Sequence, residues 1–152
     1  MKINDLLTEN TIVFDSTITS KEDLFSKAAD VFEKEGIVTN AKKFKKDLYK
    51  REKETSTGIE DHFGIPHAKS KWVTRPALAF IKSGEVSDYE ALDGTHVGYS
   101  FVIAVPSANA DTHLAILSGL ARLLMDEQFR DDLKQASDTQ GVLDVVESYW
   151  YK

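Results

Sequence analysis

The spacing of apolar residues in the first part of the chain predicts a strand followed by an amphipathic helix. The run Thr11–Phe14 is short and rich in β-branched residues, which is typical of a strand. From Leu24 to Phe32, apolar residues recur three and four positions apart, which is the period of a helix with one buried face. Thr19-Ser20 before this stretch and Gly36 after it are typical of helix ends.

A second helix and an irregular stretch come next. Asn40 is a typical N-cap, and Phe44 and Leu48 lie on one stripe of the helix that follows it. We expect this helix to run to about Lys53. From residue 55 to residue 70, glycines and a proline interrupt any clean period, which predicts a loop passing into a short strand.

Two nearly continuous apolar runs, 76–81 and 99–105, predict the centre of a sheet. Runs of this length that end at Gly, Ser or Pro fit strands covered on both faces. Residues 106–111 predict a turn, and Asp111 is placed to cap the helix after it. The apolar positions of that helix are Leu114, Leu117, Leu120, Ala121 and Leu124.

Two more helical stretches, at about 127–136 and 139–149, complete the pattern. Helices flanking buried strands predict an α/β or α+β sandwich, and the strand order stays open. The chain has 152 residues and no repeat or linker, which suits a single domain over residues 1–152. No stretch approaches the ~20 apolar residues of a membrane span, and the N-terminus has no run of signal-peptide length.

Composition narrows the chemistry. The chain has no cysteine, which excludes disulfides, thiolate metal sites and a cysteine nucleophile, and suits a reducing cytoplasm. The net charge of −6 argues against general binding to nucleic-acid backbones. One basic cluster lies in the second helix, where a solvated helix face is expected. Its members are Lys42, Lys43, Lys45, Lys46, Lys50, Arg51 and Lys53.

His67 is presented in a manner that favours chemistry. Pro66 before it has a fixed φ and no N–H, and Ile65, which precedes the proline, is pushed towards extended geometry. A neutral imidazole offers a nitrogen lone pair near pH 7, so it can act as a nucleophile, a general base or a metal ligand. The alternative is a loop histidine that only satisfies a backbone hydrogen bond.

Two further residues suit the handling of an anion. His113 falls in the expected first turn of a helix, where unpaired N–H groups and the helix dipole favour anions. Arg51, in the last turn of the second helix, carries a fork of donors suited to phosphoryl oxygens. For each of the two, the alternative is a solvent-facing residue at a helix end.

The remaining histidines suggest no second site. His62, His67 and His113 are not spaced as a local metal motif, so we expect neither a metal nor a cofactor. His96 lies in an expected turn before a strand and is assigned no role.

Five stretches of the chain, taken together, resemble the motifs of a known family. They are Arg51-Glu52, "STGIEDHFGIPHAKS", "ALDG", "FVIAVPSANADTHLAIL" and "LARLLMDEQFRDDL". Together, and in this order, they resemble the enzyme IIA (EIIA) domain of the fructose/mannitol class of the bacterial sugar phosphotransferase system (PTS), over roughly residues 5–148. The glycine-containing loop that ends in Ile-Pro-His is specific when the Asn-x-x-x-His-Leu element is also present, as from Asn109 to Leu114.

The resemblance implies a fold, a reaction and partners. The family fold is a single α/β sandwich with a mixed central sheet between helices. The phosphorylated histidine falls on His67, the second active-site histidine on His113, and the arginine that steadies the phosphoryl group on Arg51. The phosphocarrier HPr donates the phosphoryl group, and a cysteine of the cognate enzyme IIB (EIIB) accepts it. The domain itself is cytoplasmic and meets the membrane only through EIIB and the enzyme IIC that imports the sugar.

Elementary electrostatics agrees with these roles. A phosphoryl group adds roughly −1.5 to −2 charge at neutral pH, which Arg51 and His113 can offset. Charge-assisted hydrogen bonds are worth about 1.5–3 kcal/mol each. His67 must stay neutral to attack, and we expect burial among Ile65 and Phe63 to keep its pKa from rising.

Three positions depart from the family. This chain has Glu60 and His62 where small residues, often glycines, are common, and Gly64 where alanine is common. We expect His62 to be exposed, with a third group near the phosphoryl site as the alternative. Our hypothesis for the pair Glu60-Asp61 is that it tunes the fit of EIIB.

Two functions share the same phosphorylation site. One is a carrier in sugar uptake; the other is a stand-alone regulatory module whose phosphorylation state controls docking on other proteins. The sequence of this domain does not indicate which sugar is transported, because the domain contacts only phosphoryl groups and proteins. We expect a monomer, because no apolar stripe is left over once the core is assigned.

Overall fold

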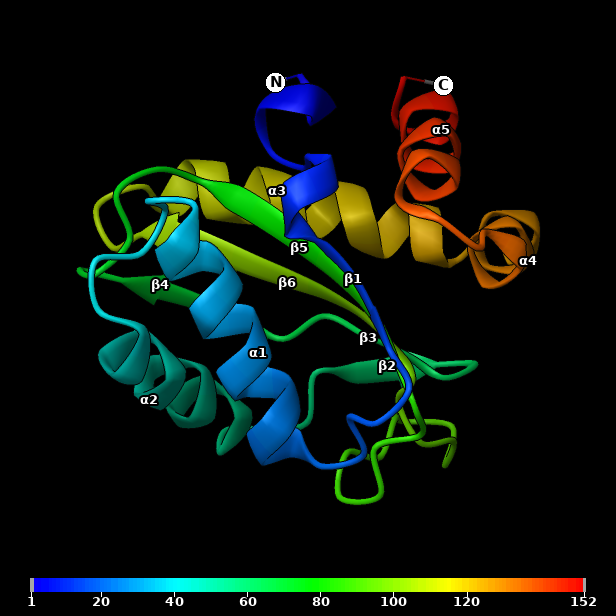
Figure 1. The fold of residues 1–152 in the computed structure, drawn as a ribbon, viewed down its shortest axis with the longest axis horizontal. Coiled ribbons are helices and arrows are strands. Elements are labelled where there is room, and N and C mark those ends of the chain that lie inside the picture. Colours follow the sequence, from blue (N-terminus) through cyan, green and yellow to red (C-terminus); the bar gives the residue numbers. More distant parts are fainter. Residues whose placement is uncertain (1, 152) are drawn as a thin grey trace.

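The computed structural model describes residues 2–151 and shows a mixed β-sheet with helices on both faces (Figure 1). The expected α/β sandwich is therefore confirmed. The strands are β1 (Ile12–Asp15), β2 (Gly58–Glu60), β3 (Phe63–Gly64), β4 (His67–Ser70), β5 (Ala77–Ser83) and β6 (Tyr99–Pro106). The helices are α1 (Lys21–Lys34), α2 (Ala41–Glu52), α3 (Ala110–Leu124), α4 (Glu127–Gln135) and α5 (Thr139–Trp150), with short 3₁₀ turns at Ile3–Asp5 and Glu9–Thr11.

The sheet order shows where the strand that begins with His67 lies. The order is β1-β5-β6-β3-β2, and β4 also pairs with β6. β5 and β6 are antiparallel, whereas β1 runs parallel to β5 and both β3 and β4 run parallel to β6. β3 lies beside Tyr99 and Ser100 of β6, and β4 begins further along, with His67 opposite Ile103.

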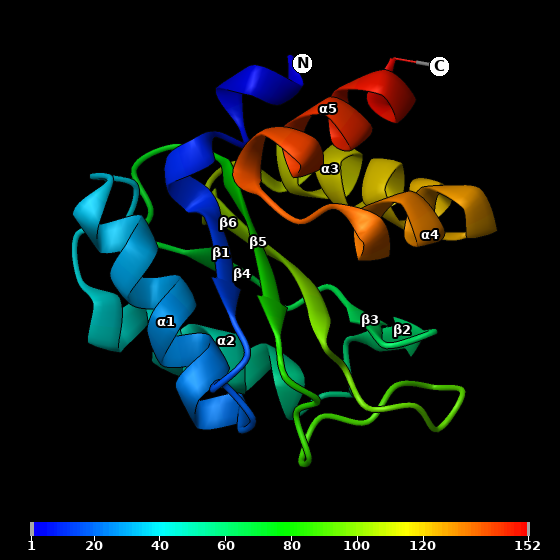
Figure 2. The same ribbon diagram turned by 45° about the vertical axis from the view of Figure 1, so that its right-hand side comes forward.

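Each face of the sheet has its own core, because alternate residues of β5 and β6 point to opposite sides. Small residues such as Ala77 and Ala79 pack with α1 and α2 on one face. Large residues such as Phe80 and Phe101 pack with α3, α4 and α5 on the other. Figure 2 shows the two groups of helices on either side of the sheet. Both faces are buried, which is why these strands read as continuous apolar runs.

Local sequence signals placed the first two helices correctly. The Ser20 hydroxyl accepts a hydrogen bond from Asp23 N–H, and the Asn40 side chain accepts one from Lys43 N–H. Gly36, just beyond α1, takes a positive φ of 72°, as a glycine after a helix commonly does. Most of the basic cluster on α2 faces solvent as predicted, and Lys45 pairs with Glu22.

Two expectations for α3 were wrong. Asn109, not Asp111, occupies the N-cap position, and its side chain makes no capping hydrogen bond; Asp111 lies inside the first turn. Leu114 does not belong to the core, because 63% of its surface is exposed. Of the other expected positions, Leu120 and Leu124 are buried against the sheet and Leu117 is partly buried, as predicted, and Ile116 joins them. Ile116 continues the four-residue spacing of Leu120 and Leu124, so periodicity alone did not decide between Leu114 and Ile116.

The chain before His67 is more ordered than predicted. The stretch 55–70 forms three short strands, because β6 offers one long edge along which both β3 and β4 pair. The first strand is shifted by one residue, to Ile12–Asp15, because Thr11 ends a 3₁₀ turn. Among residues 2–151, no helix combines the length and the apolar character that crossing a membrane requires.

Candidate active site

A hollow of about 400 Å³ opens between α2, β4 and the start of α3. Its lining residues are Asp47, Lys50, Arg51, Glu54, His67, Ala68, Lys69 and His113. The structure thus brings together the three residues singled out in the sequence, which come from three separate elements. Four of the lining residues, at positions 47, 50, 51 and 54, follow helical spacing, and this signal in the sequence was missed.

His67 is held in one tautomer by the backbone beside it. Its Nδ1 lies 2.7 Å from the carbonyl oxygen of Ile65. A carbonyl oxygen only accepts, so Nδ1 carries the proton, and in the neutral ring Nε2 is left with its lone pair. The backbone just before the imidazole is also held by the carbonyl oxygen of Pro66, which accepts from Ile103 N–H at 2.9 Å.

The surroundings of His67 keep it neutral. Only 7% of the residue is exposed, and this burial is the main reason why its pKa is lowered. The Arg51 charge lowers the pKa further, while the hydrogen bond to Ile65 and the charges of Glu52 and Glu54 raise it. The expectation that burial keeps the pKa of His67 from rising is confirmed in direction.

His113 approaches His67 from the first turn of α3. The two imidazole rings meet edge to face, with centroids 5.2 Å apart and ring planes at 84°. Burial, followed by the charges of His67, Lys69 and Arg51, lowers the pKa of His113 to about 4. Its Nδ1 is buried and has no hydrogen-bond partner among residues 2–151. His113 is therefore a neutral ring with an unused polar atom beside His67.

Arg51 supplies the positive charge of the hollow. It lies in the last turn of α2, as predicted, and its Nη1 donates to the carbonyl oxygen of Thr55 at 3.0 Å. Since a guanidinium has five N–H donors, most of them stay available to an anion. Its charge is felt by both imidazoles, whose pKa values it lowers.

This arrangement suits the transfer of an anionic group to nitrogen. A neutral imidazole with a free lone pair faces a hollow that also contains Arg51, Lys50 and Lys69. Such a site offers a nucleophile together with cations that offset the arriving charge. Within residues 2–151, no group of three His, Cys, Asp or Glu side chains has the arrangement to hold a metal ion.

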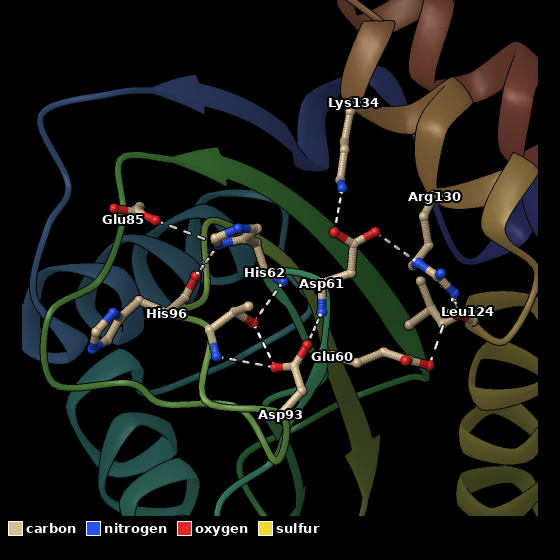
Figure 3. Close-up of polar contacts among 10 residues, drawn as sticks. Glu60, Asp61, His62, Glu85, Asp93, His96, Leu124, Arg130 and Lys134 are labelled. Carbon is tan, nitrogen blue, oxygen red and sulfur yellow. Dashed lines mark hydrogen bonds and ion pairs between the residues drawn. The ribbon is translucent and has the colours of Figure 1, made fainter.

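His62 belongs to a different region, the turn between β2 and β3 (Figure 3). Its Nδ1 donates to the carbonyl oxygen of His96 at 2.8 Å and lies 3.4 Å from a carboxylate oxygen of Glu85. It does not line the hollow beside His67. The expected exposure is met only in part, since 37% of the side chain is exposed.

The same turn has an unusual backbone conformation and pairs with α4. Asp61 and His62 take positive φ values of 53° and 70°, a conformation that favours glycine. The Asp61 carboxylate binds Arg130 Nε at 2.9 Å and Lys134 Nζ at 2.5 Å, as Figure 3 shows. Glu60 lies 3.8 Å from Arg130. Both acidic residues therefore face α4 of the same molecule.

Comparison with known proteins agrees with this geometry. A family model described as "Phosphoenolpyruvate-dependent sugar phosphotransferase system, EIIA 2" matches residues 5–149. The chain belongs to this family. The EIIA domain is thus a member of the fructose/mannitol class of PTS components, as the resemblance implied.

Individual relatives agree. The EIIA domain is 36% identical over 149 residues to the "PTS system fructose-specific EIIABC component" of Bacillus subtilis, covering 98% of this chain and 24% of that protein. The chain therefore spans about a quarter of that relative. The nitrogen regulatory protein IIA-Ntr from Neisseria meningitidis has the same fold, with a TM-score of 0.87, 30% identity and coverage of 95% and 98% of the two chains.

A third relative is a complex. In "Complex of enzyme IIAMTL and phosphorylated enzyme IIBMTL" from Escherichia coli, the matched chain is 19% identical to this one, with a TM-score of 0.73 and coverage of 94% of this chain and 99% of that chain. At this level of identity the likeness concerns the fold.

Proposed function

We propose that the EIIA domain accepts a phosphoryl group from phospho-HPr on Nε2 of His67 and passes it to a cysteine of a cognate EIIB during sugar uptake, in the cytoplasm. The observation that supports this most is the Nδ1–H···O=C bond from His67 to Ile65, because it leaves Nε2 as the only nitrogen of the neutral ring with a lone pair. His113 and Arg51 are assigned to stabilise and orient the group.

The two transfers balance without a cofactor. In the first, the Nε2 lone pair of His67 attacks phosphorus, the P–N bond of the donor phosphohistidine breaks, and the donor imidazole recovers the electron pair. In the second, a thiolate of EIIB attacks the same phosphorus, and Nε2 recovers its pair. Throughout, Nδ1 keeps its proton on the Ile65 carbonyl oxygen. Phosphoryl transfer requires mainly positioning and charge stabilisation from the protein, which the hollow offers.

Membership of the family supports a sugar PTS role, and the mannitol-class relative from Escherichia coli forms a complex with phosphorylated enzyme IIB. The test is incubation with enzyme I, HPr and phosphoenolpyruvate. We expect an acid-labile, base-stable label that is lost in His67→Ala. A label of undiminished yield in that variant would place the acceptor elsewhere.

A second function is favoured by the nitrogen regulatory relative, whose fold matches with a TM-score of 0.87. A regulatory module would be phosphorylated on the same His67 but would transfer nothing onward. The two functions can be distinguished when purified phosphorylated protein is mixed with the cognate EIIB. Rapid loss of label to EIIB supports the carrier, whereas a stable label together with phosphorylation-dependent binding of another protein supports the regulator.

A further inference from the structure

Glu52, Thr57 and Tyr89 form a polar cluster with little exposure to solvent. Glu52 is the last residue of α2 and follows Arg51 directly, yet its side chain is only 5% exposed. One carboxylate oxygen accepts from Thr57 N–H at 3.1 Å, and the other accepts from the Thr57 hydroxyl at 2.7 Å. The Thr57 hydroxyl also contacts the hydroxyl of Tyr89, a fully buried side chain.

The cluster reaches His67 through two successive backbone hydrogen bonds. The carbonyl oxygen of Thr57 accepts from Ile65 N–H at 3.0 Å. The carbonyl oxygen of Ile65 then accepts from Nδ1–H of His67 at 2.7 Å. Glu52 thus anchors Thr57, Thr57 anchors the backbone of Ile65 at its N–H, and the carbonyl oxygen of the same residue decides which imidazole nitrogen carries the proton.

We propose that Glu52 is a positioning residue for phosphoryl transfer, which acts through Thr57 and Ile65 to hold His67 in its Nδ1–H tautomer with Nε2 free. The inference rests on the proposed function in one respect, namely that Nε2 of His67 is the phosphoryl acceptor.

The carboxylate sets the direction of the hydrogen bonds. Since a carboxylate only accepts, the Thr57 hydroxyl donates to Glu52 and must accept from the Tyr89 hydroxyl. Every polar atom of the cluster then has a partner. Lys21 balances the charge, with Nζ 3.6 Å from Glu52 and 5.0 Å from the centre of the Tyr89 ring. Buried networks of this kind hold their members rigidly when complete and are costly when one member is wrong.

Replacement of Glu52 by glutamine would disrupt this arrangement of hydrogen bonds. Glutamine has only one acceptor oxygen, so either its NH₂ faces Thr57 N–H, donor against donor, or its NH₂ faces the Thr57 hydroxyl. In the second case the NH₂ donates to the hydroxyl oxygen, and one of the two hydroxyl protons, that of Thr57 or that of Tyr89, is left without an acceptor. Thr57 is then no longer fixed at both its N–H and its hydroxyl, and the Ile65 carbonyl oxygen that it aligns can shift. In this condition the Nε2–H tautomer of His67 becomes populated, and that tautomer has no lone pair on the attacking nitrogen.

The effect of the Glu52 charge on His67 can be separated from the positioning effect of Glu52. Glu54 offers the comparison, because both carboxylates raise the pKa of His67 by their negative charge. Glu54 lines the hollow but makes none of the hydrogen bonds that lead to Ile65. Glu54→Gln is therefore the matched control for loss of charge, and Thr57→Ser, which keeps the hydroxyl, is the matched control for Thr57→Val.

The experiment measures the tautomer of His67 in the full chain by ¹⁵N NMR of the imidazole at a pH where the ring is neutral. It also measures the rate of phosphorylation by phospho-HPr. We expect Glu52→Gln and Thr57→Val to mix the two tautomers and to slow phosphorylation about 10- to 100-fold, the range expected of misplaced reacting atoms. Glu54→Gln and Thr57→Ser are expected to keep the single Nδ1–H tautomer.

A single Nδ1–H tautomer and a wild-type rate in both Glu52→Gln and Thr57→Val would overturn the proposal. Should one of the two variants fail to fold, the other decides. Because the tautomer is read in unphosphorylated protein, its dependence on Glu52 stands or falls without any transfer. Failure of the wild-type protein to accept phosphate from phospho-HPr would instead reject the proposed function.

Discussion

The imidazole rings of His67 and His113 share one hollow, edge to face, with 5.2 Å between their centroids. Burial is the main reason why the pKa of each ring is lowered, and the pKa of His113 falls to about 4. A proton on His67 opposes a second one on His113, because the charge of His67 lowers the pKa of His113. The unphosphorylated site is consequently uncharged on both rings at neutral pH, ready for an anion.

The stability of the fold should depend on pH through His113. Its pKa is about 4 in the folded protein and about 6.5 in an unfolded chain, so between these values the unfolded state binds more protons. The stability that the neutral His113 contributes to the fold is fully present above about pH 6.5 and is lost as the pH falls towards 4. We expect the urea midpoint to fall over this window, and to fall less steeply in His113→Gln. An unchanged slope in that variant would contradict the assignment.

Arg51 should affect both the pKa of His67 and the rate of phosphorylation. Removal of its charge in Arg51→Gln is expected to raise the pKa of His67, which that charge lowers. Loss of one charge-assisted hydrogen bond to the phosphoryl group predicts a rate about 10- to 100-fold lower. Lysine at this position should recover only part of the rate, because it lacks the guanidinium fork.

The measurements are an NMR titration and the initial rate with phospho-HPr. Arg75→Gln is the matched control, since Arg75 is an exposed arginine outside the hollow and its replacement changes the net charge equally. If Arg51→Gln and Arg75→Gln changed the pKa of His67 and the phosphorylation rate equally, Arg51 would have no specific role.

Asp61 should stabilise the β2–β3 turn despite its unfavourable backbone conformation. Its carboxylate binds Arg130 and Lys134, and although burial opposes this, the two cations hold its pKa below the usual value. Asp61→Ala leaves Arg130, only 9% exposed, without that partner, which should cost about 1–3 kcal/mol. Alanine keeps the cost of a Cβ atom at positive φ that aspartate already has, whereas Asp61→Gly relieves it.

Urea unfolding of the two variants measures this difference. We expect glycine at position 61 to be less destabilising than alanine by about 1 kcal/mol. The control is Asp30→Ala on the exposed side of α1, where a change within about 0.5 kcal/mol is expected. Equal stability of the alanine and glycine variants would show that the positive φ of Asp61 costs nothing.

The parts of the fold that local chemistry determines could be read from the sequence. Ser20 and Asn40 cap helices with their own side chains, so a few residues suffice to place α1 and α2. The exposed side of α3 could not be read in this way, because Leu114 fits the apolar period as well as Ile116 does. Only the position of the sheet decides which of the two is buried.

In the candidate site, too, local sequence determines some features and the topology of the sheet determines others. Arg51, His67 and His113 are far apart in the chain, and the resemblance to a family, not any spacing, suggested that they meet. The link from Glu52 through Thr57 to Tyr89 was not foreseen at all, because Tyr89 lies 32 positions from Thr57. Pairings at that distance depend on the topology of the sheet, which the sequence left open.

Gly64 lies so close to the buried side chain of Tyr89 that a larger residue has no room there. A Cβ atom on Gly64 would lie 2.8 Å from the Tyr89 hydroxyl oxygen, 3.0 Å from its Cζ and 3.2 Å from Val97 Cγ2. Since Tyr89 is fully buried and bound to Thr57, its ring has little room to move. Gly64→Ala should therefore destabilise the fold by about 1–3 kcal/mol, the usual cost of overpacking a core.

The pair can be tested as a double-mutant cycle in urea. Tyr89→Phe alone loses the hydrogen bond to Thr57 and should cost about 1 kcal/mol. In the double variant Gly64→Ala/Tyr89→Phe, the hydroxyl oxygen that would clash with the new Cβ atom is absent. The loss of unfolding free energy should therefore be smaller than the sum of the losses in the two single variants. Gly98→Ala is the matched control, because a Cβ there would meet nothing closer than 3.8 Å. Strict additivity between positions 64 and 89 would mean that the glycine is not required by the tyrosine hydroxyl.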